Sequence, residues 1–100
     1  MLTDKAKIEF ESYYNSSTSS FLLNGIDFDD LPLCVKNALI IEWFDSIGIY
    51  ITIKNKFGQN KQARIFWFSL NRGASNNEVY LSRLEATKKA IEKANEIYNI

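Results

Sequence analysis

The sequence has no histidine and only one cysteine, Cys34, in 100 residues. Histidine is the side chain that most often transfers protons near neutral pH, so the commonest catalytic group is missing. One cysteine cannot form an internal disulfide, and a structural zinc site needs several Cys or His ligands. We therefore predict a chain that is not an enzyme, holds no metal or other cofactor, and works in the reducing cytoplasm. Cys34 is expected in the core or at an interface.

The sequence also lacks a phosphate-binding loop and a calcium-binding loop. Its four glycines are scattered singly, which excludes a glycine-rich phosphate loop. Carboxylates cluster only at Asp27, Asp29 and Asp30, without the central glycine and terminal glutamate of a calcium loop. Because Asp29 and Asp30 directly precede Leu31-Pro32, we expect them to cap the start of a helix rather than to bind a metal.

Long apolar segments are absent as well. No stretch approaches the roughly 20 apolar residues of a membrane span, and the charged residues among the first eleven positions predict no signal peptide. Apolar residues nevertheless make up 46% of the chain and aromatic residues 14%, which is enough to build a hydrophobic core. One hundred residues suit one small domain, so we predict a single domain over residues 1–100 with no membrane association.

The net charge is zero, but the two signs are separated along the chain. Residues 1–47 hold eight acids and three bases, a net of −5, whereas residues 48–100 hold nine bases and four acids, a net of +5. Five bases and no acid lie from Lys54 to Arg72. If this stretch is a hairpin, it carries a local basic surface.

The first half of the chain predicts two strands and a helix. Residues 7–13 alternate apolar and polar side chains, the pattern of a half-buried strand. Residues 21–28 form a second apolar run with a bend or bulge. A helix is expected from residue 30 to residue 46, followed by a stop at Gly48, since glycine adopts the left-handed conformation without a steric clash.

The second half predicts further strands and a final helix. Residues 49–54 alternate isoleucine with other side chains, and residues 62–70 carry large side chains toward both faces, as in a central strand covered on both sides. Ser82, followed by Glu85, forms a capping box for a helix over residues 83–98.

These elements combine into one predicted fold. Residues 78–81 fit a short additional edge strand. The fold class is α+β, with a two-layer antiparallel sheet and two helices in the order β-β-α-β-β-(β)-α.

The helix expected over residues 30–46 is apolar on two sides. One side suits packing on the sheet and comprises Leu33, Ile40, Trp43, Phe44 and Ile47. The other side comprises Leu31, Cys34, Val35, Ala38 and Ile41. Because a second apolar side needs a cover, we predict a protein-binding site at Leu31, Val35 and Ile41. A homo-oligomer stays open as one form of that contact.

Nucleic-acid binding is the alternative function. Basic side chains neutralise phosphates and aromatic rings stack on bases, and Trp67 with three phenylalanines lies in or beside the basic stretch. This alternative assigns RNA contacts to Lys54, Lys56, Lys61, Arg64, Lys88 and Lys89. Aromatic residues within an alternating strand are more often core, and bases on a hairpin often protect its edge, so protein binding is the first hypothesis.

The order of the last five elements resembles the double-stranded-RNA-binding domain. The shared order is a helix, two strands, a short strand and a helix over residues 30–98. That family reads RNA through its first helix, a Gly-Pro-x-His loop and lysines that open its last helix. Here the loop sequence Gly58-Gln59-Asn60-Lys61 has neither Pro nor His, and Arg83, Lys88 and Lys89 approximate the lysine cluster. The resemblance therefore implies a topology more than an RNA site.

A second resemblance concerns two segments, residues 44–48 and residues 82–99. Phe44-Asp45-Ser46-Ile47-Gly48 and the run that begins Ser82-Arg83-Leu84-Glu85-Ala86 are similar to segments of small accessory proteins carried by bacteriophages and mobile elements. This resemblance implies an accessory role, such as inhibition of a bacterial defence system. The expected partner is then a protein such as a host nuclease, a CRISPR effector or its ribonucleoprotein complex.

Overall fold

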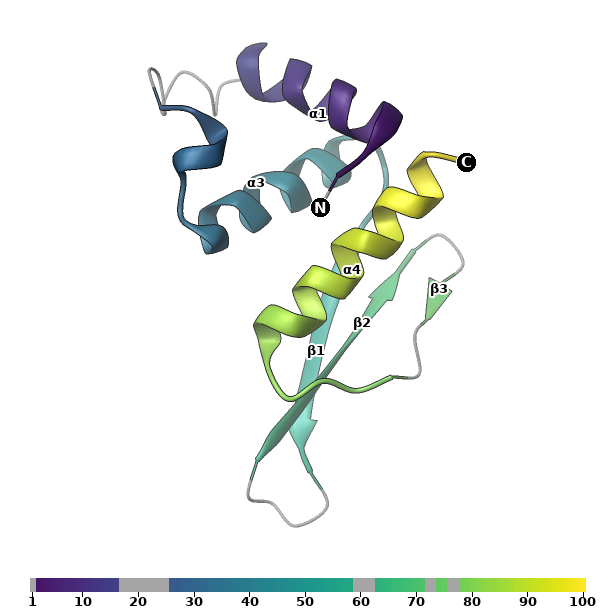
Figure 1. The fold of residues 1–100 in the computed structure, drawn as a ribbon. Coiled ribbons are helices and arrows are strands. Elements are labelled where there is room, and N and C mark those ends of the chain that lie inside the picture. The colour runs from purple at the N-terminus through teal and green to yellow at the C-terminus, as the bar shows by residue number, and fades with distance from the viewer. Residues whose placement is uncertain (1, 17–25, 59–62, 72–73, 76–77) are drawn as a thin grey trace.

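The computed structural model describes residues 2–16, 26–58, 63–71, 74–75 and 78–100 (Figure 1). Its elements, in chain order, are α1 (Asp4–Ser16), the 3₁₀ helix η1 (Phe28–Asp30), α3 (Leu33–Ser46), β1 (Ile51–Phe57), β2 (Arg64–Leu70), β3 (Ala74–Ser75) and α4 (Arg83–Tyr98). Helices and an antiparallel sheet together make an α+β fold, as predicted. The predicted order of elements is wrong, because a helix stands at the start where strands were expected.

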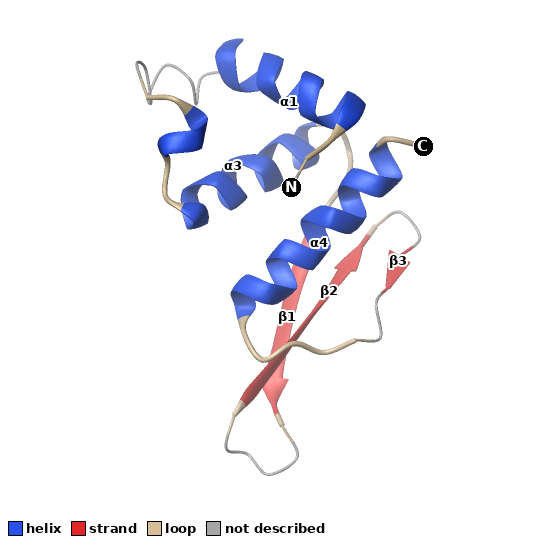
Figure 2. Ribbon diagram, viewed as in Figure 1, coloured by secondary structure: helices blue, strands red, loops and turns tan. Residues whose placement is uncertain are grey.

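The sheet is antiparallel with the strand order β1-β2-β3. Its register pairs Ile51 with Leu70 at one end and Phe57 with Arg64 at the other. Helix α4 crosses one face of the sheet (Figure 2). Ala86, Ala90 and Ala94 of α4 are completely buried, and their small side chains repeat every four residues, so the helix backbone approaches its neighbours closely.

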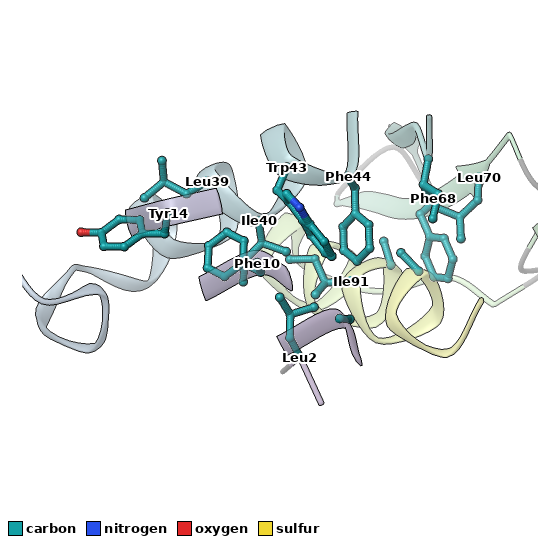
Figure 3. Close-up of a cluster of buried hydrophobic side chains, with 14 of the residues drawn as sticks. Leu2, Phe10, Tyr14, Leu39, Ile40, Trp43, Phe44, Phe68, Leu70 and Ile91 are labelled. Carbon is teal, nitrogen blue, oxygen red and sulfur yellow. The ribbon is translucent and has the colours of Figure 1, made fainter. Parts of the chain in front are cut away.

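The core is rich in aromatic rings (Figure 3). Phe44 and Phe68 are among its largest fully buried side chains. Trp43 lies edge-on to Phe10, with ring centroids 5.8 Å apart, and to Tyr98, with centroids 5.2 Å apart. Because these rings come from three helices and a strand, one core joins the two ends of the chain to its middle.

The segment predicted as the first strand is part of helix α1, so that prediction is wrong. The buried side chains of α1 and the residues just before it are Leu2, Ala6, Phe10 and Tyr14, which repeat every four residues. Ile8, which the strand pattern placed inside, is 69% exposed. The helix is favoured because its four-residue stripe packs Phe10 against Trp43 of α3 and packs both Phe10 and Tyr14 against Phe28 of η1.

Two asparagines of the C-terminal region hold the start of α1. The Thr3 backbone N–H donates to Asn95 Oδ1, and the Ala6 N–H donates to Asn99 Oδ1, each over 2.9 Å. Asn99 Nδ2 donates in return to the Thr3 carbonyl oxygen over 3.0 Å. Free N–H groups at a helix start need acceptors, so these contacts cap α1 from the far end of the sequence.

The predicted second strand, over residues 21–28, falls partly outside the described residues, and its described end is not a strand. Phe28 instead begins η1. Helix α3 begins at Leu33, with Pro32 at its N-cap and no side-chain cap bond. The expected capping by Asp29 and Asp30 is therefore wrong, because both residues belong to η1. Gly48 follows the helix with a φ of 85°, the left-handed conformation that was expected of it.

The remaining predictions meet mixed outcomes. Strands β1 and β2 and helix α4 lie where they were predicted, and the Glu85 N–H donates to the Ser82 hydroxyl oxygen over 3.1 Å. Residues 78–81 are not a strand, although Tyr80 forms a single bridge with Phe66. The count of two helices is too low, since the described residues form α1, α3 and α4. None of the described helices is long and apolar enough to cross a membrane.

Candidate functional site

The residues predicted to bind protein have different environments in the structure. Leu31 is 9% exposed and belongs to the core, so it is not an exposed contact residue. Val35 and Ile41 are half-buried and pack against the core. Cys34 is exposed, so it is not in the core, and its expected alternative position at an interface stays a prediction; Ala38 is exposed as well. This side of α3 therefore offers only scattered apolar surface.

A larger apolar surface lies between α3 and α4. It is a groove of about 540 Å³ lined by Leu33, Asn37, Ile40, Leu84, Glu85, Lys88 and Ile91, and is called the α3–α4 groove below. Leu33, Asn37 and Ile40 lie on one face of α3, since they are spaced by four and three residues. Leu84, Lys88 and Ile91 repeat the same spacing on α4, so each helix contributes one wall.

The walls of the α3–α4 groove are more apolar than an ordinary surface. Leu33 is 48% exposed and Leu84 is 50% exposed, whereas Ile40 and Ile91 are buried. Two buried isoleucines and two half-exposed leucines form an arrangement in which a partner side chain can touch apolar atoms on both walls. Burial of apolar surface contributes about 25 cal/mol per Å², so covering these leucines stabilises a complex.

Asn37 is the polar residue most deeply set in the α3–α4 groove. It is 9% exposed, and no side-chain hydrogen bond joins it to any other residue in the described part of the chain. Among the described residues no side-chain nitrogen or oxygen is sealed from solvent without a partner, so the Asn37 amide reaches the open groove. Its carboxamide carries both donors and an acceptor, the same groups that a peptide backbone offers. Asn37 is thus suited to bond a polypeptide in the groove.

The five basic residues of the RNA alternative that the structure describes do not form one surface. Lys54 and Lys56 are exposed on β1, on the sheet face turned away from α4. Arg64 lies on the opposite face of the same hairpin and donates to Asn55 Oδ1 over 2.6 Å. Lys88 lines the α3–α4 groove, Lys89 pairs with Glu92 over 3.3 Å, and Lys61 lies outside the described residues. The alternative as a whole stays a prediction.

No metal-ion site is formed by the described residues, among which no group of three His, Cys, Asp or Glu side chains converges. No protein-family model, curated protein sequence or solved structure matches this chain. The function is therefore argued from the surfaces of the molecule.

Sequence reasoning missed the α3–α4 groove, although part of its signal was present. The apolar pattern places Leu33 on the face that packs on the sheet, and the three- and four-residue spacing of apolar side chains places Leu84 in the apolar stripe of the helix predicted over residues 83–98. Both are in fact half exposed. Asn37 within an apolar helix was the available signal, because a buried amide needs a hydrogen-bond partner.

Proposed function

We propose that this chain is a non-catalytic protein-binding module whose α3–α4 groove takes a short apolar segment of a partner protein. The observation that carries the proposal is Asn37, a residue 9% exposed whose amide has no partner among the described residues and reaches solvent in the groove that the half-exposed Leu33 and Leu84 also line. Apolar walls supply affinity, and the amide supplies a direction and a register for the bound segment.

The length of the α3–α4 groove sets the size of that segment. The seven residue steps from Leu33 to Ile40 span roughly 10 Å of helix. An extended chain of about three residues covers the same length. We therefore expect recognition of a tripeptide-sized stretch with large apolar side chains at its ends, whose central backbone groups bond to Asn37.

The resemblance to phage and mobile-element accessory proteins supplies a proposal for the partner. It supports a partner among bacterial defence nucleases, including CRISPR effectors and their ribonucleoprotein complexes, and an inhibitory role in the cytoplasm. The opposed charges of the two halves of the chain favour such a charged partner surface, because complementary charge steers association.

Selection from a random peptide library tests the proposed groove directly. Leu33→Asp and Leu84→Asp place a charge on each wall at half-exposed positions that tolerate it, and Ile8→Asp is the matched control on the exposed face of α1. Selected peptides should carry large apolar residues and bind wild type and Ile8→Asp alike. Both groove variants should bind at least about tenfold more weakly, since a charge buried against apolar atoms is costly.

The outcome that contradicts the proposal is equally specific. Circular dichroism first establishes that the three variants keep the helical content of the wild type. If the selected peptides then bind Leu33→Asp and Leu84→Asp as tightly as wild type, or if no peptide is enriched, the groove is not a protein-binding site.

A further inference from the structure

One face of the β1–β2 hairpin is left without a covering layer in the described part of the chain. Exposure alternates along the chain from Ile49 to Lys54, with isoleucines on the side of α4 and Tyr50, Thr52 and Lys54 on the other side. Residues directly opposite in an antiparallel pair point the same way. The open sheet face therefore comprises Thr52, Lys54 and Lys56 with their partners Ser69, Trp67 and Ile65.

Trp67 is the central side chain of the open sheet face. It is only partly buried, and it does not pack against the core cluster. The other tryptophan, Trp43, is 3% exposed and lies inside that cluster. A tryptophan on an uncovered sheet contributes little to the core of this chain, so its ring is available to another molecule.

The charges around Trp67 all have one sign. Lys54 is its direct cross-strand partner, and Lys56 Nζ lies 5.8 Å from the centroid of its ring. Neither β1 nor β2 contains an acidic residue. The open sheet face thus combines an aromatic ring with two ammonium groups that have no carboxylate within the two strands.

We infer that the open sheet face binds single-stranded nucleic acid. Unpaired bases stack on aromatic side chains whatever their sequence, and their phosphates need nearby cations. Trp67 offers a ring for one base, and Lys54 and Lys56 offer charges for the flanking phosphates. Tyr50 is 54% exposed on the same face, about 13 Å along the strand from Lys54, and extends the platform to a second base.

A single strand fits this face better than a duplex or an acidic peptide. Bases within a duplex are stacked on each other, so a duplex meets the lysines but leaves the ring of Trp67 unused. An acidic peptide has carboxylates for the lysines but no flat rings in regular succession. The site differs from the α3–α4 groove in all its residues, so it does not depend on the proposed protein binding.

Fluorescence anisotropy with labelled single strands of about ten nucleotides tests the inference. Lys54→Gln and Lys56→Gln remove charge from the open sheet face, and Arg64→Gln is the matched control, since it removes the same charge from the opposite face of the hairpin. The two lysine variants should weaken binding, whereas Arg64→Gln should leave it within about twofold of wild type. With two phosphates neutralised, raising salt from about 50 mM to about 200 mM should cost about sevenfold in affinity.

The role of the ring is tested separately from the role of the charges. Trp67→Val should weaken binding at least about fivefold, because it removes a stacking surface but keeps a good strand former. Trp67→Phe keeps an aromatic ring, so it should retain most of the affinity. It is the control that distinguishes loss of stacking from loss of the fold. Wild-type tryptophan fluorescence should be quenched by the oligonucleotide, and this quenching should vanish in Trp67→Phe, where only the buried Trp43 remains.

Parallel titrations with oligo(U) and oligo(dT) identify the natural strand, because a preference for RNA requires contacts to the 2′-hydroxyl. Three results would overturn the inference. These are no binding at the lower salt concentration, a loss in Arg64→Gln as large as that in the lysine variants, or equal affinity for a blunt duplex.

Discussion

At the scale of single residues, Asn37 makes the clearest link between structure and function. Asn37 places an amide in the lining of the α3–α4 groove, together with the buried Ile40 and Ile91. A polar side chain among apolar groove residues is typical of a site kept for binding, since natural proteins deviate from local rules mainly at functional positions.

The substitution Asn37→Leu separates stability from binding. It should raise the free energy of unfolding by about 1 kcal/mol, because it replaces an amide that has no partner within the described part of the chain with a larger apolar side chain and a better helix former. The same substitution should weaken binding of groove-selected peptides. Urea unfolding and a peptide titration measure the two effects. A loss of stability in Asn37→Leu would mean that the amide is bonded in the native state and is not held free for a ligand.

Single residues also show why the start of the chain was predicted wrongly. Ile8 and Phe10 alternate with charged residues, so a short window favours a strand with both side chains inside. Of these two residues only Phe10 is buried. The buried side chains form a helical stripe that runs from Leu2 through Ala6 to Tyr14, and this stripe is longer than the seven-residue segment that shows the alternation. The acceptors of the Thr3 and Ala6 backbone N–H groups, Asn95 and Asn99, lie 92 and 93 residues further along the chain, and a local pattern does not contain them.

At the scale of secondary-structure elements, the well-predicted parts are those with long, regular patterns. Helix α4 has a capping serine and an apolar stripe over four turns, and β1 has strict alternation. The α3–α4 groove was not predictable in this way, because it depends on how two helices diverge in space. The cover of β2 likewise depends on the arrangement of elements in space. β2 is the central strand, as expected, but in the described part of the chain a helix covers only one of its faces.

The attachment of α1 gives a prediction at the element scale. Asn99→Ala removes the acceptor of the Ala6 N–H and the donor to the Thr3 carbonyl, so it should lower the free energy of unfolding by about 1 kcal/mol. Hydrogen exchange should speed up in α1 more than in β1 and β2. The control Glu96→Ala, at an exposed ion pair with an N–O distance of 3.9 Å, should change stability by less than about 0.5 kcal/mol. If hydrogen exchange in Asn99→Ala were faster by the same factor in α1, β1 and β2, the contacts of Asn99 would stabilise the whole fold and not α1 in particular.

At the scale of the whole molecule, two surfaces on one small domain offer different chemistry. The α3–α4 groove is apolar with one amide, whereas the open sheet face is basic with one indole ring. Their lining residues do not overlap, so a protein and a nucleic acid can occupy them at the same time. Such a pair of sites suits a ribonucleoprotein partner, which presents both kinds of surface.

Site-specific photo-crosslinking in the cell that makes the protein tests the central claim, protein binding at the α3–α4 groove, most directly. The crosslinker p-benzoylphenylalanine is placed at Leu33, at Leu84 or, as control, at Ile8, and crosslinked products are identified by mass spectrometry after nuclease treatment. We predict that Leu33 and Leu84 yield the same partner protein and that Ile8 does not. Identical products from all three positions, or none from the groove, would contradict protein binding at this groove.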